Sequence, residues 1–169
     1  METKEQKNII NVLYFLLIIS SVLSFVPHTI PQVLSIATLI LSLCAAYFYR
    51  SRDTQDGLMY NHMTYLIGTI WYGTTFIVIG MILTVLWVYM KGDHTAIYNL
   101  TADIQNGMMM TEDDMYAVMQ TYMDDNYKLL LLASTVTIGP GLAYFIYRVV
   151  RGYKRAMDGY RIANPKSWL

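Results

Sequence analysis

The stretch YLIGTIWYGTTFIVIGMILTVLWVYM, residues 65–90, decides the fold class of this chain. It is 26 residues long and contains no Asp, Glu, Lys or Arg. At a rise of about 1.5 Å per residue, a helix of this length exceeds the roughly 30 Å hydrocarbon core of a bilayer. We therefore expect residues 65–90 to form a transmembrane helix that tilts or extends past the interface.

Three further apolar runs, residues 9–26, 31–49 and 129–147, are each long enough to cross a membrane. The first follows Lys4 and Lys7 and has no small-residue cleavage site after it, which favours an uncleaved signal anchor. A short turn joins the first two runs, so they should form an antiparallel hairpin. The sequence thus predicts an all-α fold, an integral membrane four-helix bundle that forms a single domain over residues 1–169.

Basic residues are divided unequally between the two sides of a four-span arrangement. Only Lys91 and Lys128 fall on the side of the acidic loop 91–127. The positive-inside rule then places both termini and the tail 148–169 in the cytoplasm, and the loop 91–127 outside. The basic residues of the cytoplasmic side are Lys4, Lys7, Arg50, Arg52, Arg148, Arg151, Lys154, Arg155, Arg161 and Lys166.

Small residues recur at helical spacing within the predicted spans, and such stripes let lipid-embedded helices approach closely. Pro140, between Gly139 and Gly141, predicts a kink in the fourth span because proline removes a backbone hydrogen bond. We expect Cys44 to be a small buried hydrophobe. The stripes, which should face one another, are Thr38, Ser42 and Ala46; Thr69 and Gly73; Gly80 and Thr84; and Ala133, Thr137 and Gly141.

The sequence shows no pattern typical of an active site. No charged residue lies in the middle of a span, whereas ion-coupled transporters and intramembrane enzymes usually need one. There is no nucleophile–base set, no zinc-ligand spacing and no phosphate-binding loop, and one cysteine cannot form an internal disulfide. We therefore expect a protein that is not an enzyme and that has no cofactor and no nucleic-acid partner.

The loop 91–127 is too long for a simple connector. Within it, Thr111 is a good N-cap followed by acidic residues, so an amphipathic helix should begin there. Met115, Met119, Tyr122 and Met123 fall close together on this helix and are our candidate partner-binding residues.

Three interpretations of this methionine-rich helix remain open. A flexible Met-rich surface can dock a partner protein. Thioethers at the spacing of Met115, Met119 and Met123 can instead bind Cu(I). The helix can also rest on the bundle or on the membrane surface without a partner.

The tail 148–169 combines basic residues with an amphipathic pattern. Val150, Tyr153, Met157 and Tyr160 share one helical face, which predicts a short basic helix that ends near Gly159. Such a helix beside a membrane attracts anionic lipid headgroups. The candidate lipid-binding residues are Arg151, Lys154 and Arg155.

Two stretches carry a family resemblance. The first has the pattern Y-R-x(11)-H-x-x-Y-x-I-x-T-x-W-x-G from Tyr49 to Gly73, and the second leads from R-x-x-R-G at Arg148 to N-P-x-x-W-L at Asn164. In both, the chain resembles a family of small bacterial inner-membrane proteins of unknown function, distantly related to a membrane component of the chloroplast protein-import translocon. The resemblance implies a multi-pass protein of the bacterial inner membrane. The chain departs from its relatives at Gly68, where they carry a basic residue, and in the loop 91–127, where they have a short turn.

These features favour a small accessory or structural subunit of a membrane complex. Its expected partners are other membrane-protein subunits and anionic lipids. The translocon kinship and Pro140 suggest a second hypothesis, a component of a transport or translocation system, and copper binding by the loop is a third. Self-association through the small-residue stripes is equally compatible with the sequence.

Overall fold

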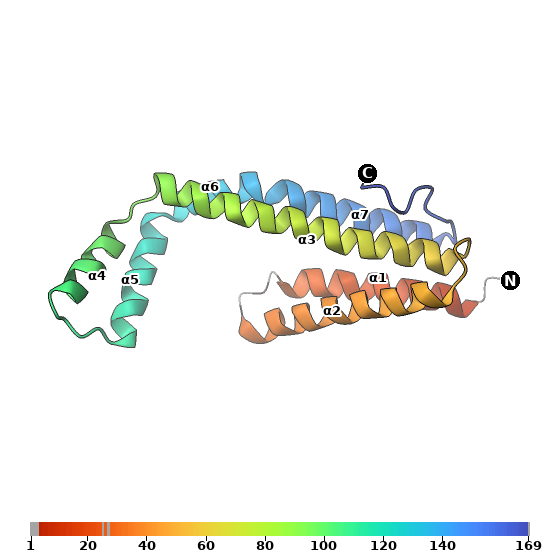
Figure 1. The fold of residues 1–169 in the computed structure, drawn as a ribbon, viewed down its shortest axis with the longest axis horizontal. Helices are drawn as coiled ribbons and strands as arrows, with labels where there is room; N and C mark the ends of the chain where they lie inside the picture. Colours follow the sequence, from red (N-terminus) through yellow and green to blue (C-terminus); the bar gives the residue numbers. More distant parts are fainter. Residues whose placement is uncertain (1–3, 25, 27, 169) are drawn as a thin grey trace. The chain divides into compact units, whose positions relative to one another are not determined.

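The computed structural model describes residues 4–24, 26 and 28–168, and every regular element within these residues is an α-helix. This confirms the predicted all-α class (Figure 1). The helices follow the apolar runs and the amphipathic pattern of the loop and the tail. They are α1 (Lys4–Ser24), α2 (Thr29–Arg52), α3 (Leu58–Lys91), α4 (Thr95–Gln105), α5 (Glu112–Asp125), α6 (Tyr127–Thr137) and α7 (Gly139–Met157).

Three of the described helices, α1, α2 and α3, are long and apolar enough to cross a membrane. The pair α6 and α7 makes a fourth candidate if the two count as one bent span. At most 28% of the apolar window of α1, α2 or α3 is buried inside the protein, so most of each surface is left to face lipid or another chain. This is the pattern of a multi-pass membrane protein.

The fourth candidate span is broken at Ile138, because α6 ends at Thr137 and α7 begins at Gly139. The two helices are bent by 44° at this point. Pro140 lies in the first turn of α7, and its missing N–H cannot donate to the preceding turn. The predicted kink near Pro140 is therefore confirmed.

The chain divides into two compact units. The first unit combines the described residues up to Thr75 with residues from Leu142 onward, and the second unit covers Phe76–Gly141. Each unit has its own close helix contacts, and α3 belongs to both because the division falls within it.

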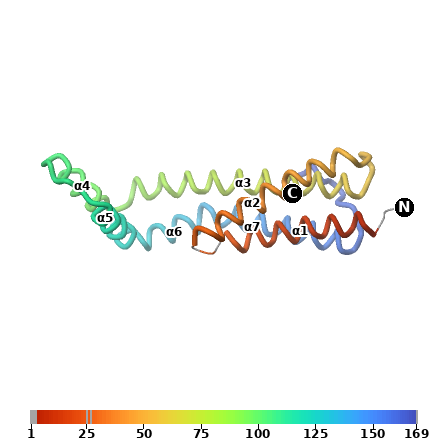
Figure 2. The backbone as a smooth tube through the Cα atoms, turned by 90° about the horizontal axis from the view of Figure 1, so that it is seen from below, coloured from red at the N-terminus to blue at the C-terminus, as the bar shows by residue number. Residues whose placement is uncertain are grey.

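In the first unit, α1 and α2 form the expected antiparallel hairpin (Figures 1 and 2). Ser20 and Ser35 join them reciprocally: each hydroxyl donates to the backbone carbonyl of the other, at 2.9 and 2.7 Å. The core of this unit gathers side chains from four helices and from the tail. Among them are Ile10, Tyr14 and Leu17 of α1, Ala46 of α2, Met63, Leu66 and Ile70 of α3, Val149 and Ala156 of α7, and Ile162 of the tail.

The small-residue stripes lie at close helix contacts. In the first unit, a Cβ on Gly73 would stand 2.3 Å from Cδ2 of Phe145, so α3 and α7 can approach this closely only with glycine. In the second unit, the Thr84 and Thr137 hydroxyls lie 2.6 Å apart and link α3 to α6. Thr84 and Thr137 thus meet as expected, whereas Gly73 faces Phe145, which is not a stripe residue.

The expectation that Cys44 is buried was wrong. The residue is exposed, because it lies on the face of α2 turned away from the buried Ser42 and Ala46. In a membrane protein an apolar side chain need not be inside the protein to avoid water, since lipid offers a similar environment.

Replacing Gly80 by valine should destabilise the second unit. A Cβ on Gly80 would lie 2.5 Å from the backbone oxygen of Thr137, which cannot move as a side chain can. We expect a loss of about 1–3 kcal/mol in unfolding free energy, typical of overpacking. The measurement is denaturant unfolding in mixed micelles, with Gly139→Ala as control because nothing lies within 4 Å of its Cβ position. Equal stability of the two variants would contradict the observed contact.

Candidate functional site

The first candidate surface is the helical hairpin α4–α5, which follows α3 in the second unit. Helix α5 begins where expected: Thr111 is its N-cap, and a capping box joins Thr111 to Asp114. The Thr111 hydroxyl accepts from the Asp114 N–H at 3.2 Å, and the Asp114 carboxylate accepts from the Thr111 N–H at 3.0 Å. Helix α4, with the sequence TAIYNLTADIQ, also lies within the loop 91–127, where the sequence predicts only the helix that begins at Thr111.

A buried asparagine ties the two ends of this hairpin together. The Asn126 side chain accepts from the Asp93 N–H at 2.7 Å and donates to the Asp93 carbonyl at 2.8 Å. Gly92 fits beside it because a Cβ there would lie 2.9 Å from the Asn126 Oδ1. Asn126 therefore holds the residue before α6 against the residues that follow α3, so the two ends of the hairpin are adjacent. No sequence motif marked Asn126, whose partner is 33 residues away.

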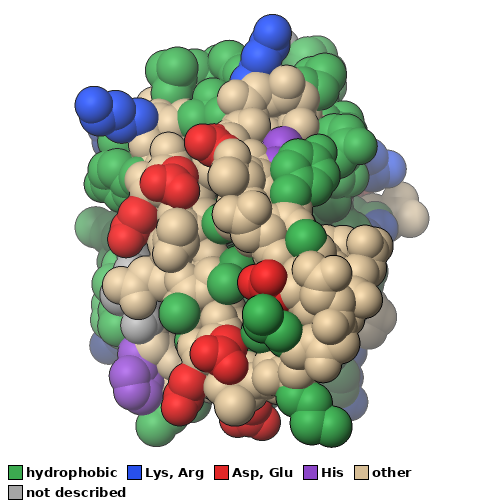
Figure 3. Space-filling view, turned by 90° about the vertical axis from the view of Figure 1, so that its left-hand side faces the viewer, with side chains coloured by type: hydrophobic (Ala, Val, Ile, Leu, Met, Phe, Trp, Pro, Cys, Tyr) green, Lys and Arg blue, Asp and Glu red, His purple; other side chains and the backbone are tan. Residues whose placement is uncertain are grey.

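The predicted methionine face of α5 is exposed. Met115, Met119 and Met123 retain 52%, 61% and 49% of their accessible surface, so they do not pack against the other helices of the second unit. Tyr122 differs from them: it is half-buried, and its ring stacks on His94 at 5.8 Å between centroids. Figure 3 views the end of the molecule where α4 and α5 lie, and shows acidic side chains beside hydrophobic ones. The methionines are thus a surface, whereas Tyr122 helps to hold the hairpin together.

An apolar pocket of about 420 Å³ lies between the end of α3 and the hairpin. Its one strongly polar side chain is His94, whose ring lies against Tyr89, Tyr98 and Tyr122. The His94 Nε2 is 2.9 Å from the Tyr89 carbonyl, to which it can only donate. The remaining lining residues are Thr84, Val85, Val88, Ile97 and Leu130.

The second candidate surface is the basic part of α7 in the first unit. Lys154 and Arg155 are exposed and Arg151 is half-buried, so all three remain candidates for lipid contact. The helix ends at Met157 and Gly159 follows with φ of +73°, as expected from the sequence. The face of α7 that is buried in the protein is formed by Phe145, Arg148, Val149, Gly152 and Ala156. Val150, Met157 and Tyr160 are exposed.

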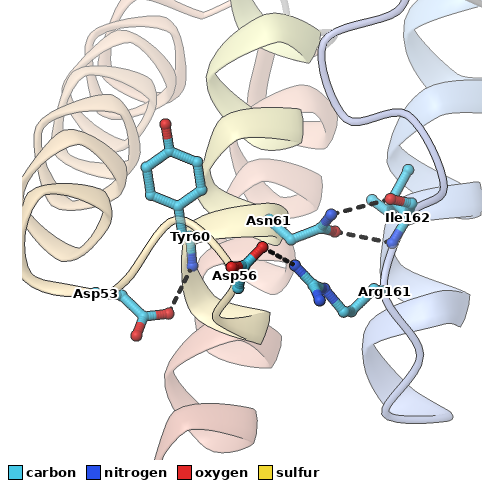
Figure 4. A network of polar contacts seen from close by, with 6 residues as sticks. All are labelled: Asp53, Asp56, Tyr60, Asn61, Arg161 and Ile162. Carbon is cyan, nitrogen blue, oxygen red and sulfur yellow. Dashed lines mark hydrogen bonds and ion pairs between the residues drawn. The ribbon is translucent and has the colours of Figure 1, made fainter.

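Beyond α7, the segment 160–168 turns back along the helices and is held mainly through its backbone. We call it the tail strap. Asn61 of α3 makes two bonds to Ile162: its Nδ2 donates to the Ile162 carbonyl at 2.9 Å, and its Oδ1 accepts from the Ile162 N–H at 2.8 Å (Figure 4). The Tyr72 hydroxyl donates to the Lys166 carbonyl at 3.4 Å. The nearby ion pair of Arg161 and Asp56, at 4.0 Å on the surface, adds little.

His62 connects the strap to α1. Its Nε2 lies 3.0 Å from the Tyr160 carbonyl, which can only accept, so Nε2 carries the proton. In the neutral ring, Nδ1 is then left to accept from the Tyr14 hydroxyl at 3.3 Å. Gly152 makes room for Tyr14, since a Cβ there would lie 2.5 Å from its hydroxyl oxygen. The chain Tyr14–His62–Tyr160 thus joins α1, α3 and the strap.

Arg148 is the largest fully buried side chain of the described residues, with 1% of its surface exposed. Its Nε donates to the Thr69 hydroxyl at 3.0 Å and its Nη1 to the Ser167 carbonyl at 2.6 Å. Its Cζ lies 4.1 Å from the centre of the Tyr65 ring, a cation–π distance. No ion pair joins Arg148 to a carboxylate within residues 4–24, 26 and 28–168.

The fold therefore brings together the two stretches singled out in the sequence. His62, Tyr65 and Thr69 of the first stretch contact Arg148 and the strap of the second. In the sequence, Arg148 is one of ten basic residues on the predicted cytoplasmic side, and no local pattern predicts its burial. The available indication was its position directly after the apolar run 129–147, where a charge can either snorkel to the interface or turn inward.

Replacing Asn61 by alanine should release the strap. The Ile162 N–H and C=O would lose their partners, and leaving buried polar groups unpaired costs about 1–3 kcal/mol each. We expect faster amide hydrogen exchange at Ile162 and earlier proteolytic cleavage within 160–168. Asn164→Ala is the matched control, because the Asn164 side chain is exposed. Unchanged protection of Ile162 in Asn61→Ala would show that the strap is held by other contacts.

The first turn of α5 should depend on pH. Hydrogen bonds from the Thr111 side chain and backbone lower the pKa of Asp114 below its ordinary value of 3.8. The stabilisation is therefore complete above pH 3.8 and is lost as the pH falls through the lowered pKa. We expect NMR chemical shifts of this turn to report fraying only below pH 3.8, and Thr111→Ala to raise the pKa of Asp114. A midpoint unaffected by Thr111→Ala would refute the capping assignment; Asp113→Asn is the control.

Comparison with known proteins does not extend these findings. No protein-family model matches the chain, and no curated protein or solved structure matches it either. The resemblance described from the two sequence stretches therefore stays a prediction.

Proposed function

We propose that this protein is a small, non-enzymatic accessory or structural subunit of a complex in the bacterial inner membrane. Its termini would lie in the cytoplasm and the hairpin α4–α5 on the opposite side of the membrane. The single observation that carries the proposal is the exposed methionine face of α5, formed by Met115, Met119 and Met123.

The methionine face has the chemistry of a docking surface. A row of exposed thioethers costs solvation free energy in the isolated chain, and contact with a partner would recover it. Methionine side chains are unbranched and polarisable, so they adapt to a partner surface. Glu112 and Tyr116 flank Met115 and Met119 and line the same shallow depression, which supplies a polar rim.

The face is also presented on an ordered element. The capping box holds the start of α5, and Asn126 ties its end to the residues that follow α3. A rigid support lowers the conformational entropy that binding must remove. A long insertion that is folded and capped, but exposes methionines, is more consistent with recognition than with a simple connector.

The proposal is tested by site-specific photo-crosslinking in intact cells. A photoreactive phenylalanine analogue replaces either Met119 or Thr121, which are both exposed but lie on different faces of α5. We expect a discrete protein adduct from position 119 and none from position 121. Adding Met115→Glu should weaken the adduct by about tenfold, since one disrupted contact at the centre of an interface costs on the order of 1.4 kcal/mol or more. Equal adducts from both positions, or adducts with lipid alone, would rule out docking by this face.

A further inference from the structure

The apolar pocket of the second unit lies among α3, α4, α5 and α6, and its volume of about 420 Å³ is typical of ligand sites. The polar groups in its walls are already bonded within the protein. The Thr84 hydroxyl donates to the Gly80 carbonyl at 3.0 Å, and the His94 Nε2 donates to the Tyr89 carbonyl at 2.9 Å. The walls therefore offer an occupant mainly contacts with aliphatic groups and aromatic rings.

The pocket is open to the outside of the protein. Val85, Tyr89 and Tyr98 line it and are exposed, so they form its rim. Val88 is buried and Tyr122 is half-buried, so they lie deeper. An occupant can therefore enter between the rim residues and pack against the deeper side chains.

An exposed apolar stripe of α3 leads into this pocket. It consists of Val78, Ile82, Val85 and Tyr89, which follow one another at intervals of four, three and four residues and so share one face of the helix. Within residues 76–141 no other helix covers the stripe. In a multi-pass membrane protein, such a face of a span meets hydrocarbon. The pocket is therefore continuous with a surface that faces lipid.

The position of the pocket along α3 indicates the class of its occupant. The apolar run 65–90 ends next to Tyr89, and the acidic hairpin follows Lys91. A change from apolar to charged residues, with tyrosine rings beside it, marks the membrane interface, where acyl chains meet headgroups. From this level the stripe runs back towards the middle of the span. A hydrocarbon chain fits both surfaces, whereas a polar ligand would lose its hydration without gaining hydrogen bonds.

We propose that the pocket holds one acyl chain of a membrane phospholipid, whose headgroup stays at the level of Lys91. The chain fills the space between α3 and the hairpin α4–α5 and continues along Val85 and Ile82. It makes contacts with several helices at once, so it is held more firmly than the lipids that cover a single exposed helix face. The site is separate from the methionine face of α5, because none of Met115, Met119 and Met123 lines the pocket.

Two matched pairs of variants separate the pocket from lipid-facing surface in general. Val85→Trp places a large side chain at the rim, and Val78→Trp places the same side chain about two turns away on the same face of α3, outside the pocket. Ile97→Trp does the same on the opposite wall, with Ile104→Trp as its control on α4. All four positions are exposed, so the larger side chains do not disturb a buried core.

The experiment uses the full chain in a mild nonionic detergent. The probe is a phosphatidylethanolamine with a diazirine midway along one acyl chain, a zwitterionic lipid that the acidic hairpin does not repel. After illumination, labelled residues are identified by mass spectrometry, with and without an excess of unlabelled phosphatidylethanolamine. For the wild type we expect labels that gather on the pocket walls of α3, α4 and α5, Tyr98 and Tyr122 included, and that the excess lipid removes.

The variants are compared at Tyr98 and Tyr122, which all of them retain. Val85→Trp and Ile97→Trp should each lower the labelling of these two residues by about tenfold, whereas Val78→Trp and Ile104→Trp should leave it near the wild-type level. Equal labelling in the members of both pairs would overturn the site. So would wild-type labels that spread over the exposed faces of the spans and persist in excess lipid, a result that does not depend on how any variant folds.

Discussion

The burial of the Arg148 guanidinium is the constraint on which the first unit depends. A charge removed from water must find hydrogen-bond acceptors and polarisable neighbours, and each of those found here fixes a different element. The hydrogen bond to Thr69 fixes the position of α3 along α7, and the bond to Ser167 holds the strap. The Tyr65 ring covers the guanidinium. Because the partners come from distant parts of the chain, the hydrogen bonds of Arg148 fix how α3, α7 and the strap align with one another.

The strap is held by further side chains of the first unit. The strap has no regular secondary structure, so its buried backbone groups need partners from other elements. Asn61, His62 and Tyr72 supply donors and acceptors to the strap from one edge of α3. His62 in turn holds Tyr14 of α1, so polar bonds and the apolar core of the first unit strengthen one another. The second unit has a simpler design, in which small residues bring α3 and α6 together and Asn126 closes the hairpin.

The two units therefore suit different proposed roles. The second unit presents α5, whose methionines are exposed on a capped and tethered helix, and this supports recognition of another protein. The first unit instead uses buried polar side chains to hold α1, α3, α7 and the strap together. Four buried side-chain atoms of the described residues have no hydrogen-bond partner, namely Asn11 Oδ1, Thr64 Oγ1, Tyr65 Oη and Arg148 Nη2.

Features that depend on local composition could be predicted from the amino-acid sequence. Uninterrupted apolar runs identified the membrane helices, Pro140 located the break before α7, and Thr111 marked the start of α5, because each of these effects acts within a few residues. The sequence did not reveal which face of α7 is buried, the stacking of Tyr122 on His94, or the exposure of Cys44. These features and the burial of Arg148 depend on contacts between segments that are far apart in the sequence. The partners of Arg148 include Thr69, 79 residues away, and no local pattern encodes whether a charge at the end of a span meets water or meets another helix.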